Sequence, residues 1–267
     1  MSNIAPAITD FIAAHRLDTL EGAFDFDGGA DLVKPGLGNR RRTKIDLPDA
    51  PSLFLKRYYR LPLSKRIKTL LNPRKWMCEA MIEHNNIRAV EAAGLRTMHP
   101  LAADVEGSLL GGRRSYTLVD AVAGETLETA IGPLVQERGE EITEAIATLA
   151  RALHHAGFVH RDFYLCHIFA DTANGPIELS LIDLARVIRP SRLRQFRWRV
   201  KDLSQLYYSC SQEFREAHWN TLLARYLDTT SSSATFVRWN RAIQAKAARI
   251  ARHDQKRHAR FTETKSS

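Results

Sequence analysis

One stretch near the middle of the chain constrains the fold more than any other. It runs from His160 to Phe169 and places an arginine, an aspartate and two histidines between apolar residues. A short apolar run from Leu179 to Ile182 follows and ends at Asp183. An acid on a loop after a helix, followed by a strand and a second acid, is typical of enzymes that transfer phosphoryl groups. The chain is therefore expected to fold so that Asp162 and Asp183 lie side by side.

Length and composition are those of an ordinary globular protein. With 267 residues, 44% of them hydrophobic and 26% charged, the chain can bury one large core or two modest ones. Apolar runs fall short of the roughly 18 residues that a membrane span needs. The first residues carry no basic group ahead of their apolar stretch, so a secretory signal is not expected. The three cysteines are far apart and odd in number, which favours the cytoplasm.

The charge balance favours an anionic partner. The chain has 39 basic and 30 acidic residues, a net charge of +9, and such an excess attracts polyanions. Nucleic acid, an anionic membrane surface and a phosphorylated substrate all fit this balance. Composition does not choose among them.

The first half of the chain predicts strands with one main helix. The expected elements are a weak helix at 3–21, two short strands joined by a glycine turn at 33–45, a strand at 52–58, a basic linker at 60–75, a helix at 76–93 and strands at 98–101 and 114–120. The main helix ends at Gly94, a common C-terminal signal.

The second half predicts mostly helices around the central stretch. The expected elements are an amphipathic helix at 140–156 that ends at Gly157, a strand at 177–182, helices from about 200 onward and a Ser/Thr-rich loop at 229–235. This change of character predicts two lobes, an N-lobe at 1–120 and a C-lobe at 121–267.

Lys56 is the candidate for nucleotide binding in the N-lobe. It interrupts an apolar strand, where an unpaired ammonium group is costly, so a carboxylate or phosphate partner is expected. Glu79 and Glu83 on the following helix are alternative partners, and either can equally be a solvated helix charge. Gly36 and Gly38 precede the strand in a turn that suits a cover over phosphates, although an ordinary turn has the same residues.

The polar residues of the central stretch each have a functional and a structural interpretation. Asp162 suits the carboxylate that accepts a proton from an attacking hydroxyl, and it equally suits the cap of the next turn. Asp183 suits a magnesium ligand or a turn at the end of a strand. His167 suits a metal ligand or a polar anchor of the loop, and the histidines and cysteine around it match no common zinc spacing.

These residues together resemble the protein kinase-like fold, with a lysine on a strand, a glutamate on a helix and two acids around a short strand. The stretch HRDFYLCHIF at 160–169 is similar to the bacterial lipopolysaccharide core kinase family. That family places a histidine where most kinases have an asparagine, and His167 stands there. The segments 83–97 and 199–209 are also similar to the family, whereas antibiotic phosphotransferases usually have His-Gly-Asp at the loop.

The resemblance implies an α+β fold of bilobal, protein kinase-like architecture. The N-lobe would be small and β-rich with one main helix, and the C-lobe would be larger and helical. Two departures accompany the resemblance. Asp183 is followed by Leu-Ala rather than Phe-Gly, and Gly36 and Gly38 do not complete a GxGxxG motif.

The resemblance also implies the cofactors and the residues that bind them. ATP would lie between the lobes, with Lys56, paired with Glu83, on its α- and β-phosphates and with Gly36 and Gly38 in the turn above. Mg²⁺ would be held by Asp183 and His167.

The catalytic residues implied by the resemblance are His160, Arg161 and Asp162. Asp162 would deprotonate a sugar hydroxyl during in-line transfer of the γ-phosphoryl group. Arg161 would hold the segment after the metal-binding acid, and Asp202 would brace the loop by hydrogen bonds.

The implied activity is ATP-dependent phosphorylation of a sugar hydroxyl of the lipopolysaccharide core, on heptose or Kdo. Basic residues between Arg189 and Lys201 alternate with Phe196 and Trp198 and would grip this anionic glycolipid. A basic helix at 238–260 suits peripheral contact with the cytoplasmic leaflet of the inner membrane, and a solvated face fits it equally.

Three alternatives stay open at this point. The enzyme can act on a protein or a small metabolite instead, or the chain can be an inactive pseudokinase scaffold. A nucleic-acid binder is disfavoured, because that function requires none of Lys56, Asp162 and Asp183 at kinase-like spacing.

Overall fold

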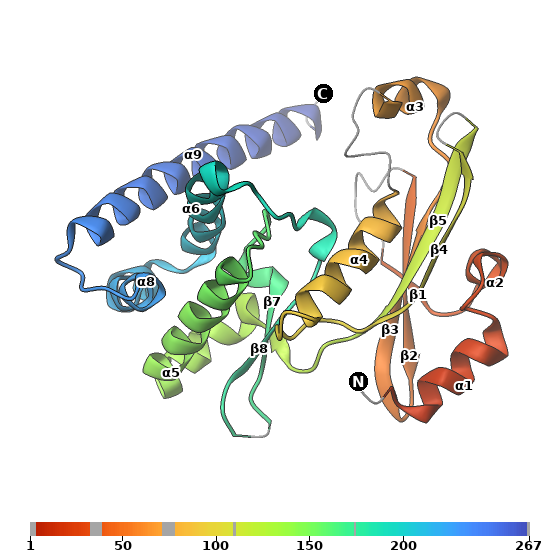
Figure 1. Ribbon diagram of the computed structural model, residues 1–267, viewed down its shortest axis with the longest axis horizontal. Helices are drawn as coiled ribbons and strands as arrows, with labels where there is room; N and C mark the ends of the chain where they lie inside the picture. Colours follow the sequence, from red (N-terminus) through yellow and green to blue (C-terminus); the bar gives the residue numbers. More distant parts are fainter. Residues whose placement is uncertain (1–3, 33–38, 71–77, 109–110, 174, 266–267) are drawn as a thin grey trace. The chain divides into compact units, whose positions relative to one another are not determined.

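The computed structural model describes residues 4–32, 39–70, 78–108, 111–173 and 175–265. The chain divides into two compact units, each with its own sheet and helices. The first unit comprises Met1–Ala123 with Asp183–Ala185, and the second comprises Gly124–Ile182 with Arg186–Ser267. Figure 1 colours both units along the sequence from red to blue.

An antiparallel sheet forms the frame of the first unit. Its strands are β1 (Ala30–Asp31), β2 (Arg40–Leu47), β3 (Ala50–Tyr58), β4 (Pro100–Ser108) and β5 (Gly112–Asp120), in the order β1-β2-β3-β5-β4. The central strand β3 places Lys56 opposite Arg42 on β2 and Thr117 on β5. Because β3 has neighbours on both edges and cover on both faces, its side chains are largely buried.

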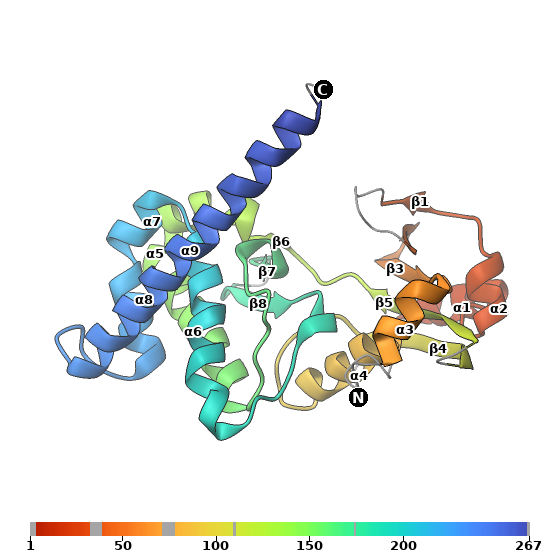
Figure 2. The ribbon, with the colours of Figure 1, turned by 90° about the horizontal axis from the view of Figure 1, so that it is seen from above.

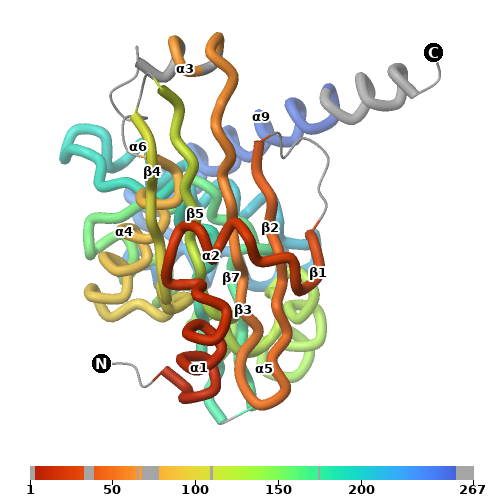
Figure 3. Tube along the Cα trace, turned by 90° about the vertical axis from the view of Figure 1, so that its right-hand side faces the viewer, coloured from red at the N-terminus to blue at the C-terminus, as the bar shows by residue number. Residues whose placement is uncertain are grey.

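Helices cover both faces of this sheet. The helices of the unit are α1 (Pro6–His15), α2 (Leu20–Asp25), α3 (Leu63–Leu70) and α4 (Glu79–Glu91). In Figures 1 and 3, α1 and α2 lie on one face of the sheet and α4 lies on the other. Side chains of a strand alternate between the faces. Leu53 and Leu55 therefore join the core beneath α1 and α2, whereas Lys56 points toward α4.

Helices dominate the second unit. They are α5 (Leu127–His155), η2 (Leu165–His167), α6 (Arg192–Ser209), α7 (Gln212–Ala217), α8 (Trp219–Leu227) and α9 (Ala234–Lys265). A short 3-10 helix, η3, covers Leu184–Arg186. The small antiparallel sheet of this unit is β6 (Glu125–Thr126), β7 (Ile168–Asp171) and β8 (Glu178–Leu181), in that order. Helix α9 packs along α6, and α5 packs against α8 (Figure 2).

The structure confirms the prediction of an α+β fold that is β-rich in its first part and helical in its second. The strand with Lys56, the main helix of the first unit and the strand before Asp183 all form near the expected bounds. The expected helix at 3–21 is instead two helices, because Arg16 adopts a left-handed conformation with φ of 53° and ends α1.

The predicted basic linker at 60–75 is wrong over its first part, where α3 forms. Pro62 stands directly before this helix, a position at which its fixed φ favours a first turn. Helix α5 contains the predicted helix at 140–156, and it follows the turn at 122–127 that the sequence predicts to lead into a helix. It starts at Leu127 and contains a break at Arg138, where φ is −140° and ψ is 41°.

Candidate active site

The first unit holds the candidate nucleotide-binding pair. Lys56 of β3 donates a hydrogen bond to Oε1 of Glu83 on α4, and the two side chains are only 11% and 1% exposed. The Tyr58 hydroxyl lies 3.5 Å from Oε2 of the same glutamate. Glu79, the alternative partner, pairs with Arg40. Kinases use a strand lysine held by a helix glutamate to present an ammonium group to nucleotide phosphates.

The second unit holds the candidate catalytic loop, which connects α5 to η2. Asp202 of α6 is fully buried. Its Oδ2 accepts from the backbone nitrogen of His160 at 2.6 Å, and its Oδ1 accepts from that of Arg161 at 2.8 Å. Gln205, also on α6, accepts from the backbone nitrogen of Phe163 at 3.2 Å and donates to the carbonyl oxygen of Arg161 at 3.0 Å. One helix thus fixes the loop backbone on both sides of Asp162.

A buried histidine supports Asp202 from behind. Nε2 of His154 lies 3.3 Å from Oδ2 of Asp202, and Nδ1 lies 2.8 Å from the hydroxyl of Tyr226. Burial lowers the pKa of His154, so its imidazole is neutral near pH 7. A neutral ring that donates to the carboxylate from Nε2 accepts from the tyrosine hydroxyl at Nδ1, which satisfies both nitrogens.

Two candidate residues adopt a backbone conformation that is uncommon outside glycine. The φ angle is 70° at Arg161 and 56° at Asp183. Such positions cost roughly 1–3 kcal/mol and cluster at functional sites. The hydrogen bond from the Arg161 nitrogen to Asp202 offsets this cost in the loop. After Asp183, the carbonyl oxygen of Leu184 accepts from Nδ2 of Asn86 at 2.7 Å.

Arg186 engages the carboxylate of Asp162 directly. Its Nη1 lies 2.7 Å from Oδ1 and 2.6 Å from Oδ2, and the Asp162 side chain is 17% exposed. The sequence offers one signal for this arginine, a basic residue shortly after the second acid, and its role was not predicted. The Arg161 guanidinium lies over the ring of Trp198 at 5.2 Å and reaches the carbonyl oxygen of Arg186 at 3.5 Å.

Lys201 is a second cation that the sequence analysis placed only within a basic cluster. Its Nζ donates to the carbonyl oxygen of Arg161, one residue before Asp162. Burial, with a smaller effect of the charge of Arg186, lowers the pKa of Lys201 to about 8. The fold therefore keeps a partly desolvated ammonium group beside the candidate base.

The two histidines of the loop contact backbone carbonyls, His167 within the loop and His160 just after β8. Nδ1 of His167 lies 2.7 Å from the carbonyl oxygen of Asp162, and Nε2 of His160 lies 3.0 Å from that of Ile182. The two rings stack with centroids 5.9 Å apart. His160 itself is fully buried.

Asp183 suits a magnesium ion better than His167 does. Within the described residues, no group of three or more His, Cys, Asp or Glu side chains could hold a metal on its own. Mg²⁺ in nucleotide sites uses one or two carboxylates together with substrate phosphates, and it prefers oxygen ligands. One aspartate therefore fits. The imidazole of His167, bound to the loop carbonyl, fits the role of an anchor.

Several other predicted residues have protein partners or cannot be placed. Gly36 and Gly38 lie outside the described residues. Within the basic cluster, Arg189 lies over Phe158 at 4.2 Å, and Arg199 donates to the carbonyl oxygen of His154 at 2.8 Å. These two arginines are therefore occupied in stabilising the second unit.

The fold and the two sets of side chains define a protein kinase-like phosphotransferase. The solved structure described as "WaaP in complex with acyl carrier protein" matches 92% of this chain and 97% of its own, with a TM-score of 0.65 and 22% sequence identity. This likeness confirms the predicted protein kinase-like fold.

The model of the "Lipopolysaccharide kinase (Kdo/WaaP) family" matches residues 36–226, and the chain belongs to this family. A relative in Escherichia coli, "Lipopolysaccharide core heptose(I) kinase WaaP", is 29% identical over 183 residues, which are 65% of this chain and 68% of the relative. The protein of the same name in Pseudomonas aeruginosa is 29% identical over 179 residues, 63% of this chain and 66% of its own length. The predictions of a kinase and of a lipopolysaccharide core kinase are thereby confirmed, and the family implies ATP as the phosphate donor.

Proposed function

We propose that this kinase transfers the γ-phosphoryl group of ATP to a hydroxyl of a heptose in the lipopolysaccharide core, with Asp162 as the base. The observation that carries the proposal is the buried pair of Lys56 and Glu83. Burying an ion pair is no general means of stabilising a fold. A kinase, however, needs this pair to hold an ammonium group ready for phosphates. Heptose is favoured over Kdo because the relatives are heptose(I) kinases.

Each unit contributes its own part of the reaction. In the first unit, Lys56 binds the α- and β-phosphates while Glu83 fixes its position. In the second unit, Asp162 takes the proton from the acceptor hydroxyl as the new bond to the γ-phosphorus forms and the bond to the departing ADP oxygen breaks. Both carboxylate oxygens of Asp162 keep a lone pair for this proton while Arg186 holds their orientation.

Asp183 is the residue that would hold Mg²⁺, which neutralises charge on the phosphates when bound. His160 would hold the catalytic loop against the residue that follows β8, through the carbonyl oxygen of Ile182, and His167 would fix the loop internally through the carbonyl oxygen of Asp162. Asp202 would brace the loop by accepting from the backbone nitrogens of His160 and Arg161.

An acceptor panel tests the proposed function. Radiolabelled γ-phosphate of ATP is offered with purified core glycolipid, with the same glycolipid already phosphorylated on heptose, with Kdo alone and with generic peptides. The account expects label on the unphosphorylated core and a large loss of signal on the phosphorylated one. Label only on peptides, or only on Kdo, would show that the acceptor is different.

We also propose a peripheral membrane contact, and we place it on α3. No helix among the described residues is long and apolar enough to cross a membrane. On α3, Leu63 is 63% exposed and Ile67 is 54% exposed. They lie four residues apart on one face, and the helix sequence adds three basic residues between 65 and 68. An exposed apolar pair on a helix with a basic sequence suits an anionic leaflet.

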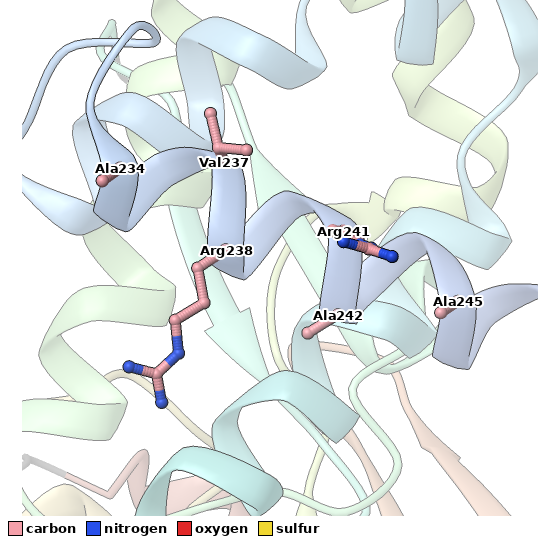
Figure 4. Close-up of a pocket in the computed structure, with 6 residues that line it drawn as sticks. All are labelled: Ala234, Val237, Arg238, Arg241, Ala242 and Ala245. Atoms are coloured by element: carbon pink, nitrogen blue, oxygen red, sulfur yellow. The ribbon is translucent and has the colours of Figure 1, made fainter.

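The C-terminal helix α9 is a weaker candidate for this contact. Arg238 lies over the ring of Phe196 at 4.8 Å. Figure 4 shows that Arg238 and Val237 leave α9 in different directions beside a pocket that three alanines also line. Two of the residues that line this pocket are arginines, and one of them already packs on an aromatic ring.

Vesicle sedimentation tests the membrane contact. The parent chain should bind vesicles with anionic lipid and bind neutral vesicles much less, with binding that weakens as salt rises. The double variant Leu63→Ser, Ile67→Ser should lose most of this binding. The control is Val237→Ser, which removes an exposed apolar side chain, 56% accessible, from a different helix. Equal binding by the double variant and the parent would show that α3 does not make the membrane contact.

A further inference from the structure

A pocket beside the candidate base lies wholly within the second unit. It has a volume of about 830 Å³, and Asp162 and Arg186 form part of its wall together with side chains of α6 and α9. Figure 2 shows α9 running alongside α6 in this unit. A volume of this size is typical of sites that hold one small ligand or part of a larger one. The pocket can therefore receive the acceptor next to the carboxylate that must deprotonate it.

The cations of this pocket come from three segments of the chain. Arg186 follows β8, Lys201 belongs to α6, and Lys246 and Arg249 belong to α9. The acids of the wall are Asp162, Glu128 and Asp254, and His253 adds a titratable group. Near pH 7 these four cations outnumber the three carboxylates, which makes the pocket electropositive.

The four cations differ in whether they already have a hydrogen-bond or ion-pair partner within the protein. Arg186 is held by Asp162, and Lys201 donates to the carbonyl oxygen of Arg161. Within the described residues, Lys246 and Arg249 have no ion-pair partner. Asp254 accepts from the hydroxyl of Tyr208 at 2.9 Å. The two cations of α9 are therefore available to a ligand.

We propose that Lys246 and Arg249 of α9, with Lys201 beside them, form a subsite for an anionic group of the acceptor, a phosphate or carboxylate close to the hydroxyl that is phosphorylated. This inference rests on the proposed function, because it places the acceptor at Asp162. Helix α9 lies beyond residues 36–226, which the family model matches. Lys246 and Arg249 thus contribute to specificity from a part of the chain outside that match, whereas Lys201 lies within it.

The partly buried ammonium group of Lys201 supports the binding of an anion in this pocket. The pKa of Lys201 is lowered to about 8 by burial, so its ammonium group is poorly solvated in the empty pocket. An anion placed among these cations would restore the lost solvation, and arginine in particular can bind a phosphate or carboxylate with two parallel hydrogen bonds. A neutral sugar would leave the same cations without this compensation.

The test uses the full chain and a soluble acceptor, so that membrane binding plays no part. The delipidated core oligosaccharide is compared with a neutral heptose-containing sugar in the parent and in the double variant Lys246→Gln, Arg249→Gln. The double variant should raise the KM for the anionic oligosaccharide by about tenfold or more, because charged hydrogen bonds are lost. Its KM for ATP and for the neutral sugar should stay within about twofold of the parent.

A matched control separates the subsite from general surface charge. Arg252→Gln removes an exposed cation of the same helix that does not line the pocket, and it should leave every KM unchanged. The single variant Arg249→Lys keeps a positive charge at this position and keeps Lys246. Its KM for the anionic oligosaccharide should therefore lie between those of the parent and the double variant. Inorganic phosphate should compete with the oligosaccharide in the parent and lose this effect in the double variant.

The outcomes distinguish the two proposals. Transfer to the core by the parent with an unchanged KM in the double variant overturns the subsite and leaves the proposed function standing. An equal rise in KM for Arg252→Gln likewise overturns the subsite. Failure of the parent to phosphorylate any core acceptor overturns both proposals together.

Discussion

Removing Lys56 alone should destabilise the protein much more than removing the whole Lys56–Glu83 pair. The variant Lys56→Met leaves the carboxylate of Glu83, 1% exposed, without a cation. Loss of one partner from a buried ion pair costs roughly 3–5 kcal/mol. The double variant Lys56→Met, Glu83→Leu removes both charges, and replacing a buried pair by apolar side chains is about neutral or stabilising. The double variant should therefore recover most of the lost stability.

Thermal and urea unfolding measure this difference, and a phosphotransfer assay measures function. The single variant should melt roughly 6–20 °C below the parent, at about 2–4 °C per kcal/mol for a chain of this size. The double variant should melt close to the parent while its transfer activity stays as low as that of the single variant. A double variant as unstable as Lys56→Met would show that the pair is needed for folding. An active double variant would show that the Lys56–Glu83 pair is not needed for nucleotide binding.

Three further results follow from the brace of the catalytic loop. Asp202→Ala strands the backbone N–H groups of His160 and Arg161, at roughly 1–3 kcal/mol each, and urea unfolding should show this loss; an unchanged midpoint would contradict it. Burial lowers the pKa of His154 in the folded state. Below about pH 6.5 this histidine is therefore protonated in the unfolded state and stays neutral in the folded state. Stability should thus fall as the pH drops from 6.5, by up to about 1.4 kcal/mol per unit, and His154→Asn should be less stable at pH 7.5 but show a shallower fall. The pKa of Lys201 is lowered to about 8, so the parent should gain stability between pH 8 and pH 10, and unfolding of Lys201→Met should lack that gain.

The sequence predicted the parts of the site that depend on local pattern. A lysine within an apolar strand must find a partner, and this argument led to Lys56 before any partner was known. The choice between Glu79 and Glu83 rested on the resemblance, and the structure pairs Lys56 with Glu83 because this glutamate lies on the buried face of α4. Glu79 is in the first turn of α4 and pairs with Arg40 instead.

Contacts between distant segments were beyond sequence reasoning. The bond from Arg186 to Asp162 depends on the turn after β8, and the approach of Lys201 to the loop depends on how α6 packs. The basic residues of α9 predicted a surface helix, but nothing in their spacing indicates which of them line the pocket beside Asp162. Helix α3 was missed because its charged residues resemble a linker, although Leu63 and Ile67 already have helical spacing.

The most direct test of the central claim is the transfer of γ-phosphate from ATP to purified, heptose-unphosphorylated core by the parent and by Asp162→Asn. This variant keeps the size of the side chain and removes only its basicity. The account predicts that Asp162→Asn folds and binds ATP like the parent, and that its kcat falls by a factor of roughly 10² to 10⁴, the usual contribution of a general base. Turnover of the core by Asp162→Asn at the rate of the parent would contradict the account.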